Sequence, residues 1–450
     1  NLDVIVVEGN GASPNTLNEA KIGDADYALC LTRVDEVNLI ASQQAHILGA
    51  NKIIARLRNQ QYSDRNSIIR PEKFGVDIII HPEKAACEEI TRLVKHPYAV
   101  QVMDFESGRL TMLGLKIDSN CNNIYDITLG NIAKSNNHFR FGVIAILRGQ
   151  ETIVPTAEFI FQEGDTAYFI IKTEDIPNLM ELLCKELTET HRVMILGGGK
   201  IGRTLAKELP SDTINTRLVD YNRLKAGQIS HNIDESMIIY GDGTDIEFLR
   251  LEEPEIIDSF IAVTENEQTN LLSALLAKHL GVRQTLIHVS TTEYIPAMKV
   301  IGLDAVVSKN MCTVNEILEY IKSDEKHLIT NFEEVDVEAI EFSPNSGSIV
   351  TKRTLGDIKF PESSIVGSIN HRGHVSIARY DTQISEEDSV LVFCLPNILP
   401  KVEKLFDVVK SMDVISLHMP LNDKTRNIID YNILKTMKKN CIIINAARGG

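Results

Sequence analysis

One segment of the chain combines a glycine-rich turn with the start of a helix in a spacing that suits a nucleotide. The run RVMILGGGKIGRTLAKEL contains an apolar strand, then Gly197-x-Gly199-x-x-Gly202, then helical residues. The first glycine permits a tight turn, the second leaves room for a pyrophosphate, and the third lets the helix pack on the strand. The free N–H groups and positive dipole end of the helix would then face the phosphates.

Acidic residues follow at the ends of the next two predicted strands. Asp220 ends the strand RLVD, where a carboxylate hydrogen-bonds ribose hydroxyls and repels a 2′-phosphate. This favours NAD(H) or another adenosine nucleotide over NADP. Asp242 and Thr244, in YGDGTD, are expected at the same edge of the sheet. The alternatives are that Asp242 is only a turn residue between glycines and that the glycine loop serves packing alone.

Residue patterns typical of an enzyme do not accompany this site. The sequence contains neither Gly-x-Ser-x-Gly nor His-Glu-x-x-His, and its seven cysteines form no Cys-x-x-Cys pair. His279 and His288 are expected to be packed or surface histidines. Glu265, Glu267 and Asn270 are expected to cap a helix, with contact to a ligand or a partner as the alternative. The sequence therefore favours a nucleotide sensor.

The segment that holds Asp242 occurs twice in the chain. Gly9–Tyr62 aligns without a gap with Gly241–Tyr294, and the identities include Thr32 with Thr264 and Asn38 with Asn270. We interpret this as an internal duplication. In both copies strands alternate with helices, which predicts βαβ units on a parallel sheet. The expected strands of the first copy are DVIVVEG (3–9), YALCLT (27–32) and KIIARL (52–57).

Short alternating strands follow each copy, at residues 98–172 and 335–395, and predict small α+β modules. The predicted fold class is therefore α/β, with tandem Rossmann-like parallel-sheet domains that are each followed by a small module. The predicted domains are 1–95, 96–188, 189–325, 326–406 and 407–450. The first copy has no glycine loop because the chain begins after the position where it would lie, and we interpret this first domain as truncated.

Composition excludes several classes of protein. The 450 residues are 43% hydrophobic and 24% charged, which indicates a globular chain. A formal charge of −16 disfavours a nucleic-acid groove, because phosphate backbones require a basic face. The scattered, odd number of cysteines suits a reducing compartment. No apolar run approaches the length of a membrane span.

The motifs VMILGGGKIG, VDYNR, IIYGDGTD and AVTENEQTNLLSALLAKHLG, in tandem order, resemble the TrkA family of regulatory subunits of potassium uptake. The resemblance covers about residues 1–406 and implies two RCK units, each with an N-domain and a C-domain. It also implies that the protein is peripheral and cytoplasmic and lies at the inner face of the plasma membrane. The resemblance further implies that the protein is not an enzyme. The implied cofactor is NAD(H) or ATP/ADP, and the implied partners are copies of the chain and a Trk-type membrane subunit that translocates potassium.

The same resemblance assigns roles to particular residues. The family's phosphate loop falls on Gly197, Gly199, Lys200, Ile201 and Gly202, its ribose acid on Asp220, and its base-proximal strand tip on Asp242 and Thr244.

The end of the chain resembles a different family. Met412–Gly450 is similar to part of a D-isomer 2-hydroxyacid dehydrogenase, most of all D-3-phosphoglycerate dehydrogenase. The resemblance implies that Arg448 pairs with a substrate carboxylate and that the HMP loop borders the cofactor. The fragment has no dinucleotide glycine loop of its own and ends before the family's later acid and histidine, so we expect an inert tail. The alternative function is an NAD-dependent oxidoreductase of 2-hydroxy acids.

Overall fold

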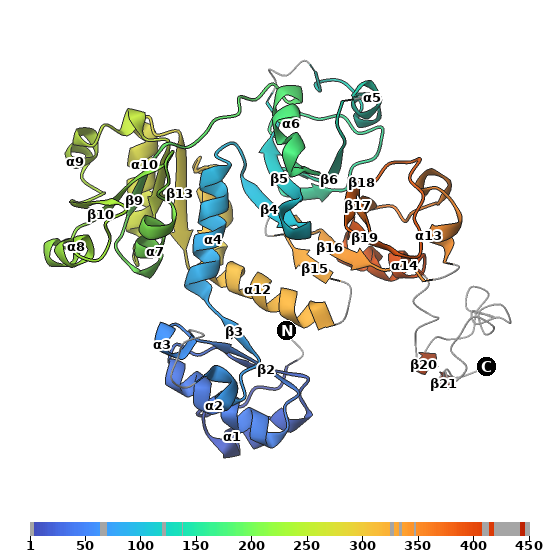
Figure 1. Ribbon diagram of the computed structural model, residues 1–450, viewed down its shortest axis with the longest axis horizontal. Coiled ribbons are helices and arrows are strands. Elements are labelled where there is room, and N and C mark those ends of the chain that lie inside the picture. The colour runs from blue at the N-terminus through green and yellow to red at the C-terminus, as the bar shows by residue number, and fades with distance from the viewer. Residues whose placement is uncertain are drawn as a thin grey trace. The chain divides into compact units, whose positions relative to one another are not determined.

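The computed structural model describes residues 4–63, 70–118, 123–136, 138–324, 328–332, 335–345, 348–406, 414–417 and 442–445. The chain forms two compact units (Figure 1). Unit 1 contains residues 1–103, 113–115 and 186–325, and unit 2 contains residues 104–112, 116–185 and 326–450.

Unit 1 contains a six-stranded parallel sheet in the order β11-β10-β9-β12-β13-β14. Its strands are β9 (Arg192–Leu196), β10 (Asn215–Asp220), β11 (Met237–Tyr240), β12 (Ser259–Ala262), β13 (Gln284–Val289) and β14 (Ala305–Ser308). The order reverses between β9 and β12, which is the arrangement of a doubly wound nucleotide-binding sheet. The predicted fold class is confirmed.

Helices cover this sheet and bury its apolar strands. They are α7 (Lys200–Glu208), α8 (Arg223–Ser230), α9 (Ile246–Leu251), α10 (Glu267–His279), α11 (Ile295–Val300) and α12 (Lys309–Asp324). Phe260 and Ile287 of the central strands pack with Ala274 of α10 in one apolar core. Strands β12 and β13 are buried along their whole length, as expected where helices cover both faces of a parallel sheet.

The first copy of the repeat also lies in unit 1. Its elements are α1 (Pro14–Glu19), β1 (Tyr27–Cys30), α2 (Asp35–Leu48), β2 (Lys52–Arg56), α3 (Gln60–Ser63), β3 (Ile78–Ile80) and α4 (Pro82–Lys95). The strands form a parallel sheet in the order β1-β2-β3, which matches β12-β13-β14 of the second copy. Gly49 caps the C-terminus of α2, and its φ of 104° suits a residue without a side chain.

Both copies contain the same four hydrogen bonds. The side-chain oxygen of Asn38 accepts from the N–H and hydroxyl of Thr32, while its amide donates to the carbonyls of Thr32 and Arg56. Asn270 makes the equivalent bonds with Thr264 and with the carbonyl of His288. The duplication is therefore preserved in the contacts that join two strand ends to a helix.

The predicted strand at residues 3–9 is wrong in its described part. Residues 4–9 form no strand, and Val4, Ile5 and Val6 are 63%, 90% and 84% exposed. By the duplication this segment corresponds to β11, which hydrogen-bonds to β10. Among the described residues of the first copy, no strand corresponds to β10. Within the part of the chain that the structure describes, this segment pairs with no strand.

Helix α4 joins the two copies. It packs against both α7 and α12 (Figure 1). Near its end, the carbonyl of Val94 accepts a hydrogen bond of 2.6 Å from the hydroxyl of Thr190, and the carbonyl of Leu93 accepts one of 3.1 Å from the amide of Gln284. The first copy is thus attached to the second by buried polar contacts as well as by packing.

Unit 2 contains most of two five-stranded sheets, in the orders β4-β5-β8-β6-β7 and β15-β16-β19-β17-β18, while residues 101–103 of β4 and 113–115 of β5 are counted with unit 1. The strands are β4 (Gln101–Phe105), β5 (Leu110–Lys116), β6 (Phe141–Arg148), β7 (Glu151–Ile153), β8 (Thr166–Lys172), β15 (Leu328–Asn331), β16 (Glu338–Phe342), β17 (Ser364–His371), β18 (His374–Ile377) and β19 (Asp388–Cys394). The helices are α5 (Leu129–Ser135), α6 (Ile176–Leu182), α13 (Ile349–Lys352) and α14 (Leu399–Glu403). The short strands and helices have the α+β character expected there, and the five-part division of the chain stays a prediction.

Two strands of the tail are described. β20 (Val414–Leu417) and β21 (Ile442–Asn445) pair in parallel. Arg448 and the HMP loop lie outside the described residues. Within the part of the chain that the structure describes, no helix combines the length and apolarity that a membrane span requires.

Candidate nucleotide site

The glycine loop lies at the point where the strand order of the sheet reverses. Gly197 follows β9 with a φ of 111°, and its N–H donates to the carbonyl of Val219 at 2.8 Å. A β-carbon at Gly202 would collide with the carbonyl of Gly197, so this glycine is needed for the approach of α7 to β9. A β-carbon at Gly199 would meet only the carbonyl of Val263, at 4.0 Å. The space in front of Gly199 is therefore open to a ligand.

Asp220 is 2% exposed and is held by three hydrogen bonds. Its Oδ2 accepts from the N–H of Gly198 at 2.9 Å and from the ammonium of Lys225 at 2.7 Å. Its Oδ1 accepts from the N–H of Asn222 at 2.9 Å. Burial acts to raise the pKa of Asp220, but the bonds from Lys225, Asn222 and Gly198 outweigh it and lower the pKa. Asp220 is thus a carboxylate with a fixed orientation.

Asp242 and Thr244 lie together after β11. The Oδ1 of Asp242 accepts from the N–H of Thr244 at 2.9 Å and from its hydroxyl at 2.8 Å. A β-carbon at Gly243 would meet the side chain of Leu196. Asp242 is therefore a turn residue that also lines the pocket described next.

These residues surround a pocket with a volume of about 390 Å³. Five of the eight predicted site residues line it, namely Gly197, Gly199, Asp220, Asp242 and Thr244. The remaining three, Lys200, Ile201 and Gly202, are not among the lining residues. Ile201 is buried, Gly202 packs against Gly197, and the ammonium of Lys200 donates to the carbonyl of Arg58 at 3.0 Å.

The structure adds lining residues that sequence reasoning missed. They are Leu196, Val219, Tyr221, Lys225, Gly243, Val263, Thr264, Asn266 and Thr269, together with Glu265, which was considered as a cap. The cap of α10 is Asn266, whose side chain accepts from the N–H of Thr269 at 2.8 Å. Glu267 instead accepts from the backbone of Ser290 at 2.7 Å. Capping was thus expected at the wrong positions, although the sequence Thr-Glu-Asn-Glu signals a helix start.

The two histidines lie where they were expected. His279 is exposed on α10, and His288 is 7% exposed on β13. Burial, and secondarily the charge of Lys309, lowers the pKa of His288 to about 4. His288 is therefore neutral at neutral pH. Among the described residues, no cluster of histidine, cysteine or carboxylate side chains could hold a metal ion.

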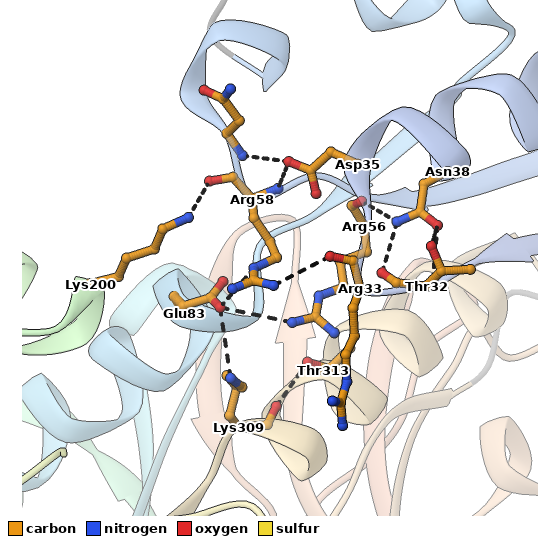
Figure 2. A network of polar contacts seen from close by, with 11 residues as sticks. Thr32, Arg33, Asp35, Asn38, Arg56, Arg58, Glu83, Lys200, Lys309 and Thr313 are labelled. Carbon is orange, nitrogen blue, oxygen red and sulfur yellow. Dashed lines mark hydrogen bonds and ion pairs between the residues drawn. The ribbon is translucent and has the colours of Figure 1, made fainter. Parts of the chain in front are cut away.

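A polar network connects the glycine loop to the first copy of the repeat (Figure 2). Oε1 of Glu83, near the start of α4, lies 3.6 Å from Nε of Arg58, 3.7 Å from Nζ of Lys309 and 3.9 Å from Nη2 of Arg56. Burial, and also the charges of the two arginines, lowers the pKa of Lys309 against the opposing effect of Glu83. Since Lys200 bonds to the backbone of Arg58, the loop contacts the residue that carries part of this network.

Three family models match the chain, two of TrkA domains and one of a dehydrogenase domain. The TrkA-N domain matches residues 1–82 and 193–309, and the TrkA-C domain matches residues 339–407. The NAD-binding domain of D-isomer specific 2-hydroxyacid dehydrogenases matches residues 374–450. Residues 374–407 fall within both matches, and the described part of this overlap, residues 374–406, contains β18 and β19 of an antiparallel sheet.

Solved structures share the fold. The GsuK channel superimposes with a TM-score of 0.56 at 16% identity, over 90% of this chain and 71% of that chain. A second structure, described as the GsuK channel bound to NAD, gives a TM-score of 0.54 at 15% identity over 88% of this chain and 70% of that chain.

Curated relatives match about 90% of the length of this chain. The Trk system potassium uptake protein TrkA homolog 2 of Methanosarcina mazei is 31% identical over 90% of this chain and 91% of its own. The TrkA homolog of Archaeoglobus fulgidus gives the same values, and TrkA of Halomonas elongata is 29% identical over 90% of both chains. The chain belongs to the TrkA family of Trk system potassium uptake proteins.

Proposed function

We propose that this chain is a peripheral regulatory subunit of a Trk-type potassium uptake system, acting at the cytoplasmic face of the membrane. One nucleotide per chain binds to the domain at residues 189–325. The observation that carries the proposal is the pocket at the reversal of strand order, with open space before Gly199 and the oriented carboxylate of Asp220. The relatives are named Trk system potassium uptake proteins, which supports a membrane subunit that translocates potassium as the partner.

The ligand class is NAD(H) or ATP/ADP. The helix start at α7 suits a pyrophosphate and Asp220 suits a ribose, features that both groups of nucleotide share. A neighbour of the same fold is described as bound to NAD, which supports the dinucleotide. In the alignment of the two copies, Asn10 takes the place of Asp242, and the first copy contains no glycine loop. This supports a single site in this chain.

The polar network offers a route from the nucleotide to the rest of unit 1. A phosphate at the start of α7 attracts the ammonium of Lys200, which otherwise bonds to the backbone of Arg58. Moving this side chain changes the contacts of the first copy, whose helix α4 packs on α12 (Figure 1). Ligand-dependent differences of this kind bias the arrangement of modules and hence the state of a bound membrane subunit.

Regulation rather than catalysis is also consistent with the pocket lining, which contains threonines, asparagine and carboxylates but no histidine or cysteine. The alternative, an NAD-dependent oxidoreductase of 2-hydroxy acids, rests on the dehydrogenase match at residues 374–450. Of that region, residues 374–406 contain β18 and β19, which both pair antiparallel to β17, whereas the sheet of a dinucleotide-binding domain is parallel with crossover helices. Farther along, β20 and β21 pair in parallel.

Titration calorimetry with NADH, NAD⁺, ATP and ADP tests the binding step. We expect saturation at one nucleotide per chain for at least one of these ligands. Two equal sites per chain contradict the single-site proposal, and no heat or thermal stabilisation with any ligand contradicts nucleotide binding. The regulatory step is tested by potassium uptake in cells that lack their own TrkA, with this chain and a Trk-type membrane subunit supplied together.

A further inference from the structure

The carboxylate that is expected to hold the ribose is already paired with a cation. Lys225, in the first turn of α8, places its ammonium 2.7 Å from Oδ2 of Asp220. Asp220 is 2% exposed, whereas the side chain of Lys225 is 42% exposed and also lines the pocket. The pair therefore has one fixed member and one that reaches into the ligand space.

Lys225 is the partner of Asp220 that a ligand can replace. The other two donors to Asp220 are the backbone N–H groups of Gly198 and Asn222, which the loop and the helix start hold in place. Lysine has a flexible four-carbon stem and an ammonium with three donors, so the head group can leave one oxygen of Asp220 and stay within reach of a ligand in the pocket. A ribose hydroxyl that approaches Oδ2 therefore displaces the ammonium, which stays beside the ribose.

The charges of the lining residues show why Lys225 affects whether the pocket accepts a 2′-phosphate. Its lining includes the carboxylates of Asp220, Asp242 and Glu265, and Lys225 is the sole cation among the described lining residues. Without a paired cation, the carboxylate of Asp220 would repel a 2′-phosphate, as expected for an acid at the end of this strand. With Lys225 present, the carboxylate is neutralised and a cation lies within reach of the 2′ position.

We propose that Lys225 is a specificity-determining residue that lets this pocket accept the 2′-phosphorylated dinucleotide NADP(H) as well as NAD(H). The inference rests on the proposed nucleotide function and replaces the preference against NADP expected from Asp220 alone. When NADP(H) binds, the ammonium of Lys225 donates charge-assisted hydrogen bonds to the 2′-phosphate, and when NAD(H) binds it only competes with the ribose hydroxyl for Asp220.

Calorimetry with NADH and NADPH, on the full chain and its variants, tests the assignment. We expect wild-type protein to bind NADPH within about tenfold of NADH, since Lys225 offsets Asp220. Lys225→Met is expected to weaken NADPH binding by about tenfold to a hundredfold, as for loss of a charge-assisted hydrogen bond, and to leave NADH binding equal or tighter. Lys225→Arg keeps the cation and is expected to keep NADPH binding.

Arg223→Met is the matched control, because Arg223 is an exposed cation in the same turn that does not line the pocket. Its ratio of NADPH to NADH affinity is expected to equal that of wild type. Equal weakening of both ligands in Lys225→Met, an unchanged ratio, or an equal effect of Arg223→Met each overturns the role of Lys225. Absence of binding of NADH, NADPH, ATP and ADP to the wild type instead overturns the proposed nucleotide function itself.

Discussion

At the scale of single residues, the glycines of the loop have separate roles. Gly197 needs its positive φ, Gly202 needs to lie against the carbonyl of Gly197, and Gly199 leaves space that only a ligand would fill. Gly198, an unspecified position of the motif, is also required, because a β-carbon there would meet Oδ2 of Asp220 at 2.8 Å.

Substitution of Gly199 separates binding from folding. Gly199 has a φ of −69°, which other residues adopt, and the added side chain of Gly199→Val would project into open space. We expect a normal melting temperature but a loss of nucleotide affinity of about a hundredfold or more, because the valine occupies the space of the pyrophosphate. Gly227→Ala, at an open position on α8, is the control for calorimetry and melting. Wild-type affinity in Gly199→Val would mean that the loop is purely structural.

The buried His288 predicts how stability depends on pH. Its pKa of about 4 in the folded state lies below the 6.5 of the unfolded chain, so between these values the unfolded state binds the additional proton. The free energy of unfolding therefore falls as pH is lowered from about 6.5 to about 4, by on the order of 3 kcal/mol for a shift of this size.

Thermal unfolding at a series of pH values measures this effect. His288→Gln removes the titrating group and is expected to flatten the dependence, whereas His279→Gln, an exposed change on α10, is expected to leave it unchanged. Equal pH profiles for wild type and His288→Gln would contradict the assignment.

At the scale of elements, Glu83 joins β2, α4 and α12 through one carboxylate oxygen that three cations share. Its side chain is 17% exposed, so its removal leaves the positive charges of Arg56, Arg58 and Lys309 without their common counter-ion. We expect Glu83→Gln to lower the free energy of unfolding by about 1–3 kcal/mol, less than for a fully buried pair.

Glu88→Gln on the same helix is the matched control for Glu83→Gln. Glu88 pairs with Lys84 one turn away, and both side chains are more than half exposed, so its loss is expected to cost at most about 0.5 kcal/mol. Chemical denaturation followed by circular dichroism compares the two variants. Indistinguishable midpoints would show that the Glu83 network does not stabilise unit 1.

At the scale of the whole molecule, the duplication places one exposed apolar residue at the same position of two helices. Ile40 of α2 and Leu272 of α10 are 44% and 49% exposed. The other leucines of α10, Leu271, Leu275 and Leu276, pack against the core of their own domain. We expect at least a dimer in solution, with Ile40 and Leu272 contributing to the contact.

Light scattering at micromolar concentration checks this expectation. The double variant Ile40→Asp with Leu272→Asp is expected to shift the mass towards the monomer, since charges are excluded from an apolar contact. Leu251→Asp, on the 80% exposed Leu251 of α9, is the control. A wild-type monomer would contradict assembly through these helices.

The dehydrogenase-like tail gives the last prediction. Phe406 is buried and stacks on Phe342 with ring centroids 4.4 Å apart, so a truncation that keeps the sheet intact begins at residue 407. Deletion of residues 407–450 is expected to leave nucleotide binding unchanged. Hydride transfer requires a bound nicotinamide next to the substrate, and residues 407–450 contain no Gly-x-Gly-x-x-Gly loop to hold one.

Absorbance of NADH, followed with 3-phosphoglycerate, lactate or glycerate and NAD⁺, checks the tail. We expect no turnover by the full chain. Turnover that disappears in Arg448→Ala would favour the oxidoreductase alternative.

The sequence by itself determined the fold class, the tandem order and the glycine loop with its acid. These are local features, because a strand, a turn and a helix start are encoded by neighbouring residues, and the repeat makes each copy a check on the other. The five lining residues among the predicted site also follow from strand ends that meet at one edge of a parallel sheet.

Only the tertiary structure decided the remaining features, which depend on residues distant along the chain or on which way a side chain turns. Residues 4–9 have the composition of a strand but pair with no strand among the described residues, and a strand exists only through its neighbour's hydrogen bonds. Lys200 belongs to the loop yet reaches Arg58 in the other copy. Lys225 belongs to no recognised motif, and its pairing with Asp220 arises because α8 lies against β10.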